Sequence, residues 1–264
     1  MSEGLSHSYG GAPIASTETG PDTETVVVLI HGSLDRGAGM ARLARLVQET
    51  HRVIRFDRRG YGAHCEHGGP FTVAGNADDV ISLMSGRRSV LVGHSFGGNI
   101  ALAVAARVPE LVAGVSTYET PLSWFEWWPK DSAGGTALTA SAEDAAETFL
   151  VRMIGRERWD NLPEKTKAQR RREGRALRDE LNDLRSGPPW EAGRITSPVL
   201  CGRGTKAMKH HLEGASRLAE ILPTGSLVSL EGAGHGAPVS HPDDFHARLI
   251  APHLEGMGTF TVTS

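Results

Sequence analysis

The chain has 264 residues, of which 39% are hydrophobic and 22% charged, and its formal net charge is −3. This is the composition of an ordinary globular protein. So small a net charge gives no electrostatic reason to expect a nucleic acid or an anionic membrane as a partner. Two cysteines, Cys65 in a loop and Cys201 in an apolar run, are too few for a disulfide framework, so Cys201 is interpreted as a core residue.

The N-terminal sequence, the length of the apolar segments and the spacing of the histidines exclude further classes of protein. The N-terminus lacks the basic and apolar regions of a signal peptide, and no segment has the length of a transmembrane helix. We therefore expect a cytoplasmic protein that acts on a small molecule, and the sequence leaves a homodimer open. The 12 histidines show no metal-ligand spacing, because the adjacent side chains of His210 and His211 should diverge on a helix. No metal and no cofactor is expected.

Strand-like and helix-like segments alternate from residue 26 to residue 118. The first of them, Val26 to Ile30, is continuously apolar and β-branched, as expected of a strand buried on both faces. Further strands are predicted at 52–56, 89–92 and 112–118, and helices at 38–49, 72–85 and 98–107. Such alternation is typical of an α/β fold with a mostly parallel, doubly wound sheet and right-handed crossovers.

The alternation stops at Pro121. Residues 121–196 hold all five tryptophans and a highly charged helix around 163–185, and we expect them to form a helical cap inserted at the carboxyl edge of the sheet. The charged helix is interpreted as a solvated face rather than a binding surface. The core, residues 1–120 and 197–264, then resumes with strands at 198–201 and 226–230 and helices at 208–222 and 242–254, which gives a sheet of about eight strands.

Residues 93–97 read Gly-His-Ser-Phe-Gly, a complete G-x-S-x-G motif. A short strand precedes the motif and a strong helix pattern follows it, which is the setting of a nucleophile elbow. The tight turn admits only small residues at Gly93 and Gly97 and holds the Ser95 hydroxyl away from the backbone. The alternative is a glycine-rich turn with an incidental serine, but the flanking segments favour a serine nucleophile.

A serine hydroxyl needs a positioned base that takes its proton. His235 follows the last strand on a loop of small residues, Glu-Gly-Ala-Gly-His-Gly, and we predict that it is the base. His241 and His246 are rivals, but they lie on or beside the last helix, where a structural role is more common. For the oxyanion hole we predict the backbone N–H groups of Phe96 and Ser33, with that of Leu34 as the alternative to Ser33.

Several segments together resemble the α/β-hydrolase family. The elbow, His31-Gly32, the run 57–62 (Asp-Arg-Arg-Gly-Tyr-Gly) and Gly234-His235 occur in that family's order and spacing, and residues 10–20 resemble its opening hairpin. The resemblance covers nearly the whole chain outside the cap and implies the fold more firmly than the substrate. It also implies that Asp57 braces its loop without being catalytic, and His31 is interpreted as a structural hydrogen-bonding residue that braces the oxyanion loop.

The expected triad acid is missing from its usual place. In many family members it follows the strand matched here by residues 198–202, but no carboxylate occurs between Arg194 and Glu213. Glu119 ends the preceding strand, in a Tyr-Glu-Thr-Pro run that resembles relatives with a relocated acid. We predict that Glu119 orients His235 and stabilises its imidazolium. The alternative is a hinge residue paired with Lys206.

Aromatic residues follow Glu119 directly, and they either line the pocket or anchor the cap to the sheet. We predict a substrate pocket formed by Leu34, Trp124 and Trp128. The function expected is hydrolysis of a small, mostly apolar carboxylic ester through an acyl-enzyme. Two alternatives stay open, namely a non-hydrolytic enzyme on the same fold, such as a lyase or a cofactor-free perhydrolase, and a ligand-binding receptor that keeps a slow triad.

Overall fold

The computed structural model describes residues 14–255, and its centre is one sheet of seven strands in the order β1-β3-β2-β4-β5-β6-β7. The strand β1 is antiparallel to β3, and all other neighbours are parallel. The mostly parallel, doubly wound sheet is thus confirmed, with seven strands in the described residues where about eight were predicted. The first residues of the predicted hairpin 10–20 lie outside the described part. The strands are β1 (Ser16–Thr19), β2 (Thr25–Ile30), β3 (Arg52–Phe56), β4 (Arg88–His94), β5 (Val112–Tyr118), β6 (Val199–Gly204) and β7 (Gly225–Leu230).

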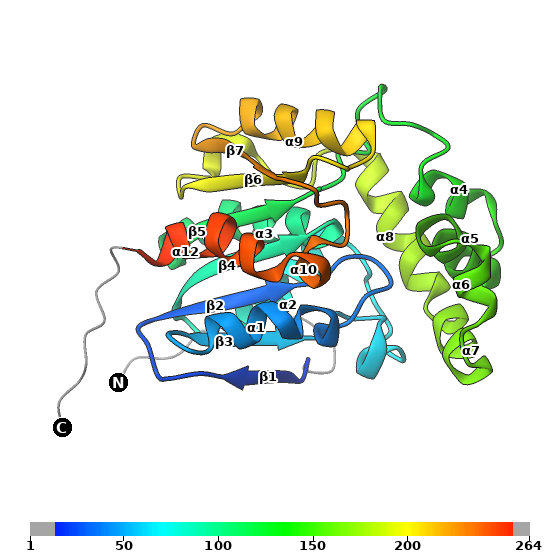
Figure 1. Ribbon diagram of the computed structural model, residues 1–264, viewed down its shortest axis with the longest axis horizontal. Helices are drawn as coiled ribbons and strands as arrows, with labels where there is room; N and C mark the ends of the chain where they lie inside the picture. The colour runs from blue at the N-terminus through cyan, green and yellow to red at the C-terminus, as the bar shows by residue number, and fades with distance from the viewer. Residues whose placement is uncertain (1–13, 256–264) are drawn as a thin grey trace.

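Two apolar layers enclose the sheet, because successive side chains of a strand point to opposite faces. Every residue of β2 is buried. Val26, Val28 and Ile30 pack into one cluster with α2, α3 and α9, whereas Val27 and Leu29 pack into another with α1 and the C-terminal helices. Figure 1 shows these helices on the two faces. Their bounds are α1 (Ala41–Val47), α2 (Val73–Met84), α3 (Phe96–Arg107) and α9 (Lys209–Ile221).

The last predicted helix, 242–254, is broken into shorter pieces. α10 (Ala237–Ser240) and α11 (Pro242–Phe245) precede a π-helical turn at His246–Ile250, and α12 (Ala251–Leu254) follows it. Pro252 lacks an N–H group, and in a regular α-helix its ring would clash with the carbonyl of Arg248 four residues earlier, so regular α-helical hydrogen bonding is interrupted at this point.

Residues 121–196, called the insertion below, separate β5 from β6. They carry α4 (Ala133–Thr139), α5 (Ala142–Ile154), α6 (Arg156–Asp160), α7 (Glu164–Arg172) and α8 (Gly174–Ser186). In Figure 1 these helices form a group at one end of the sheet. Among residues 14–255, no helix combines the length and the apolar character that crossing a membrane would require.

The charged segment 163–185 differs from its prediction. It forms two helices separated at Glu173, and only α7 is the solvated helix expected. α8 buries Leu177, Leu181 and Leu184 together with the carboxylate of Glu180. The high density of charged residues concealed this buried face, because one of the charges belongs to it.

Candidate active site

The motif of residues 93–97 forms a strained turn between β4 and α3. Ser95 has φ 53° and ψ −124° and stands directly before the first residue of α3. A Cβ atom on Gly93 would lie 2.3 Å from the carbonyl oxygen of Gly97, and one on Gly97 would lie 2.3 Å from that of Ile30. Both positions therefore require glycine, as the sequence predicted. The Ser95 hydroxyl makes no hydrogen bond to another described residue.

Unusual backbone conformations gather at the carboxyl ends of neighbouring strands. In the described chain, four residues other than glycine have positive φ, namely Leu34, Ser85, Ser95 and Glu119. Three of these follow β2, β4 and β5, while Ser85 caps the end of α2. Such conformations cost on the order of 1–3 kcal/mol each and cluster at functional sites. The strain therefore points to this edge of the sheet independently of the motif.

Glu119 and His235 are in direct contact across the end of the sheet. The Nδ1 atom of His235 lies 2.7 Å from Oε2 of Glu119, and the carboxylate side chain is fully buried. The other carboxylate oxygen accepts a hydrogen bond of 3.1 Å from the backbone N–H of Gly204. The strand that usually carries the acid, β6, thus supplies a backbone donor to the acid on β5. Lys206 is exposed and forms no ion pair with Glu119 in the described part of the chain.

Two further side chains hold the loop that carries His235. Nε2 of His94 donates a hydrogen bond of 2.8 Å to the carbonyl oxygen of His235, and the Tyr118 hydroxyl donates one of 3.0 Å to that of Gly234. His94 and Tyr118 are register partners on β4 and β5. Burial, reinforced by the charge of the nearby His235, lowers the pKa of His94 to about 3, so His94 remains a neutral donor. Neither residue was predicted from the sequence, although each directly precedes a predicted site residue.

A cavity of about 560 Å³ opens beside the elbow, within the size range of small-molecule sites. Ser95, His235 and the two predicted oxyanion residues, Ser33 and Phe96, contribute to one wall. The insertion contributes a second set of lining residues, called the insertion wall below, and residues near the start of α9 complete the lining. The insertion residues include Trp127, Trp128, Phe149, Arg152, Met153, Leu181, Leu184 and Arg185.

Known proteins resemble this chain over most of its length. Residues 27–248 match the sequence profile described as the alpha/beta hydrolase family. The chain belongs to the alpha/beta hydrolase family. A proposed esterase/lipase of Haemophilus influenzae is 25% identical over 241 residues, covering 87% of this chain and 83% of that protein. A proposed carbamate hydrolase, RutD, of Caulobacter sp. strain K31 is 26% identical over 283 residues, covering 94% and 95%. The crystal structure of the N-acyl homoserine lactonase AidH has a TM-score of 0.71 at 21% identity, covering 95% of this chain and 96% of that one.

Two predicted pocket residues do not line the cavity of this alpha/beta hydrolase. Leu34 has positive φ, and its side chain is buried in a cluster with Tyr61 and Phe71 rather than in the cavity lining. Trp124 packs edge-on against Trp190 at a centroid distance of 5.7 Å and against the apolar cluster of the core, so it helps to anchor the insertion. Of the predicted pocket, only Trp128 lines the cavity.

His210 and His211 also line the cavity, where the sequence analysis expected diverging side chains. Their rings lie 4.4 Å apart, and His211 stacks on His235 at 4.7 Å. Ligand atoms of Glu119, His211 and His235 all lie within 4.8 Å of one another, a spacing that could hold a metal ion. However, the hydrogen bond between Glu119 and His235 already pairs two of these three groups with each other.

The predicted bracing residues of the hydrolase do brace their loops. His31 donates from Nδ1 to the carbonyl oxygen of Gly32 at 2.7 Å and accepts at Nε2 from the backbone N–H of Arg58 at 2.9 Å. Burial lowers the pKa of His31 well below its ordinary value, which keeps the ring neutral and able to accept. Asp57 accepts backbone hydrogen bonds from Gly37 and Ala63, so its carboxylate fixes loops and lies outside the cavity lining.

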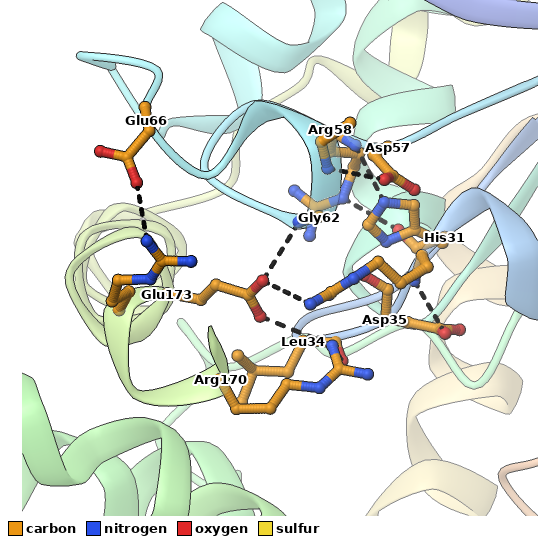
Figure 2. Close-up of polar contacts among 12 residues, drawn as sticks. His31, Leu34, Asp35, Asp57, Arg58, Gly62, Glu66, Arg170 and Glu173 are labelled. Atoms are coloured by element: carbon orange, nitrogen blue, oxygen red, sulfur yellow. Dashed lines mark hydrogen bonds and ion pairs between the residues drawn. The ribbon is translucent and has the colours of Figure 1, made fainter. Parts of the chain in front are cut away.

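Buried ion pairs join the insertion to the core beneath the oxyanion loop. Glu173, at the break between α7 and α8, accepts from Arg36 at 2.5 Å and from the backbone N–H of Gly62 at 3.1 Å. Arg170 donates to the carbonyl oxygen of Leu34 at 2.8 Å, as Figure 2 shows. Further along the chain, within α8, Glu180 pairs with Arg58 at 3.0 Å, and both side chains are almost fully buried. α8 is thereby fixed against the strand ends that carry the site.

Proposed function

We propose that this alpha/beta hydrolase is a serine hydrolase that cleaves small, mostly apolar carboxylic esters through an acyl-enzyme. The observation that carries the proposal is the 2.7 Å contact between the buried Glu119 carboxylate and Nδ1 of His235, beside a cavity that Ser95 also lines. A base oriented by an acid and placed near a strained serine is the arrangement that nucleophilic catalysis needs. The names of the relatives, an esterase/lipase and a carbamate hydrolase, support hydrolysis.

In the first half of the reaction, Ser95 Oγ attacks the ester carbonyl carbon while Nε2 of His235 takes the hydroxyl proton. Glu119 keeps the proton of Nδ1 in place and stabilises the imidazolium. When the tetrahedral intermediate collapses, the bond to the alkoxy oxygen breaks and His235 returns its proton to that oxygen. The alcohol leaves, and the acyl group stays on Ser95.

In the second half, water replaces the alcohol. His235 takes a proton from the water, the hydroxide attacks the acyl carbon, and the second intermediate collapses to release the acid and the serine hydroxyl. In that collapse the bond between the acyl carbon and Ser95 Oγ breaks, and His235 returns its proton to Oγ. In both intermediates the backbone N–H groups of Ser33 and Phe96 are our candidates for the oxyanion donors. Both residues line the cavity beside Ser95, and one such donor contributes about 3 kcal/mol to transition-state stabilisation.

Turnover of p-nitrophenyl butanoate and labelling by a fluorophosphonate test the proposal. Ser95→Ala should abolish both, and His235→Ala should abolish turnover. Ser123→Ala is the matched control, because Ser123 also lines the cavity and should leave both signals unchanged. A Ser95→Ala protein that still turns over the ester, or a wild-type protein that the probe does not label, would exclude a Ser95 acyl-enzyme. Ester turnover without labelling would instead favour chemistry that does not use a serine nucleophile.

A further inference from the structure

Arg185 places a guanidinium group in the cavity wall without an acidic partner. It lies in the last turn of α8 and lines the cavity. Its one hydrogen bond among the described residues runs from Nη1 to the carbonyl oxygen of Leu181, at 3.2 Å, one turn earlier on the same helix. No carboxylate of residues 14–255 lies within ion-pair distance. Four of its five N–H donors are therefore left for another partner.

Arg170, another partly buried arginine of the insertion, differs from Arg185 in its acidic partners. Burial lowers the pKa of both guanidinium groups from the ordinary value. For Arg170 the neighbouring carboxylates of Glu173 and Asp35 counteract that effect, and Glu173 is an ion-pair partner. For Arg185 burial is the whole cause. Arginine stays protonated in proteins, so a partly desolvated cation faces the cavity uncompensated.

The neighbourhood leaves room for an anion at this position. Gly134 also lines the cavity, and a Cβ atom there would lie 3.7 Å from Nη2 of Arg185, so the absent side chain leaves that nitrogen accessible. The other charged lining residues are Arg152, Lys209, Asp131 and Glu213, and all four are exposed. The positive charges outnumber the negative ones, and Arg185 is the most enclosed of the five.

An apolar strip accompanies Arg185 into the cavity. Leu181, Leu184 and Arg185 occupy positions i, i+3 and i+4 of α8, which share one face of a helix, and all three line the cavity. The two leucines are buried, at 7% and 0% exposure. A ligand that contacts this strip and Arg185 must therefore combine an apolar body with an anionic end.

The position of Arg185 is also fixed before any ligand binds. Glu173 and Glu180 attach α8 to Arg36 and Arg58 of the core through buried ion pairs. Glu173 directly precedes α8 and Glu180 lies on it, so the backbone of the helix that carries Arg185 is held relative to the strand ends. A prepositioned guanidinium loses less conformational freedom on binding and discriminates more sharply between ligands.

We propose that Arg185 binds a carboxylate of the substrate, so that the natural substrate is an ester with an apolar body and a terminal carboxylate. The inference rests on the proposed function, because it assigns the cavity to the substrate of Ser95. The guanidinium forms a bidentate pair with the carboxylate, and Leu181, the more exposed of the two leucines, contacts the intervening methylene groups. No bond to Arg185 forms or breaks, so it is a specificity residue.

Two matched pairs of esters test the proposal on the acyl side and on the alcohol side. The first compares p-nitrophenyl hexanoate with mono-p-nitrophenyl adipate, which replaces the terminal methyl by a carboxylate. The second compares hexyl butanoate with 6-butanoyloxyhexanoate, followed by acid release at constant pH. Uncatalysed hydrolysis is subtracted in each case. We expect kcat/KM of the wild-type enzyme to favour the charged member of at least one pair.

Variants of Arg185 then assign that preference. In Arg185→Met, kcat/KM for the charged ester should fall about tenfold to hundredfold, the scale of a lost hydrogen-bonded charge pair, while the neutral ester changes less than twofold. Arg185→Lys keeps the charge, so its kcat/KM for the charged ester should lie between the values of the wild type and of Arg185→Met. Arg175→Met removes the same charge from an exposed position of α8 that does not line the cavity and should match the wild type.

The outcomes separate this inference from the proposed function. If Ser95→Ala still cleaves the neutral esters, the proposed function fails. If Ser95 is required but the wild-type enzyme favours the neutral ester in both pairs, the carboxylate inference alone is overturned. The same holds if Arg185→Met reduces both members of a pair equally, because that pattern indicates a structural role. A parallel thermal melt shows whether each variant is folded, and the wild-type comparison needs no variant.

Discussion

The two walls of the cavity are built in different ways. The core wall consists of residues at strand ends, where backbone conformation decides the geometry. Ser95 in the lining and, outside it, Leu34 and Glu119 all have positive φ, and glycines allow close approach of the turns. The insertion wall consists of side chains on α5 and α8, such as Phe149, Leu181 and Arg185. This difference indicates that the core wall determines the catalytic geometry, whereas the insertion wall determines which substrates bind.

The largest effect should come from the acid of the core wall. Glu119→Gln replaces the carboxylate that bonds Nδ1 of His235 with an amide that can present an N–H instead, which favours the wrong histidine tautomer. We expect kcat for p-nitrophenyl butanoate to fall on the order of 10⁴-fold, with little change in KM. Glu213→Gln is the matched control, since Glu213 lines the same cavity. Full activity of Glu119→Gln would remove Glu119 from the triad.

The core wall was also the more predictable of the two. Ser95 and His235 were predicted from local signals, a motif between a strand and a helix and a loop of small residues. Glu119 was predicted from its place at a strand end together with the family resemblance, because the usual position of the acid holds no carboxylate. Parallel strands bring their carboxyl ends to one edge, so strand order alone gathers these residues. The structure brings Glu119 and His235 into contact in this way.

The insertion wall depends on tertiary packing, which local patterns do not contain. Trp124 and Trp128 are four residues apart and chemically identical, yet one packs on Trp190 and the other lines the cavity. The charged run of α8 resembles a solvated helix because Glu180 and Arg185 appear polar in any sequence pattern. Only the position of Arg58 in space shows that Glu180 is buried. His94 and Tyr118 were missed for the same reason, since their partners lie more than 100 residues away.

The buried ion pair between Glu180 of the insertion and Arg58 of the core gives the second prediction. Glu180→Gln keeps the shape of the side chain and its contact with the Tyr61 hydroxyl but leaves Arg58 as a buried, unpaired cation. Loss of one partner of a buried ion pair should lower the free energy of unfolding by about 3–5 kcal/mol, measured by urea denaturation. Glu220→Gln is the control, because it removes a carboxylate from the exposed pair with Arg217. It should change the free energy of unfolding by less than about 0.5 kcal/mol. Equal effects of the two variants would mean that the ion pair between Glu180 and Arg58 does not stabilise the attachment of the insertion to the core.

The smallest effect comes from within the core wall, from a histidine that stays neutral in the fold. The pKa of His94 is about 3 in the folded protein and near 6.5 in an unfolded chain. Below pH 6.5 the unfolded state therefore binds the extra proton, and stability falls as the pH falls. His94→Gln lacks this proton site, so between pH 7.5 and 5.5 the wild type should lose about 1.4 kcal/mol more unfolding free energy than the variant. Above pH 7.5 the two curves should run parallel, which provides the internal control. Parallel curves down to pH 5.5 would mean that His94 takes up a proton in the folded protein, and the neutral donor that holds the His235 loop would then have to be reassigned.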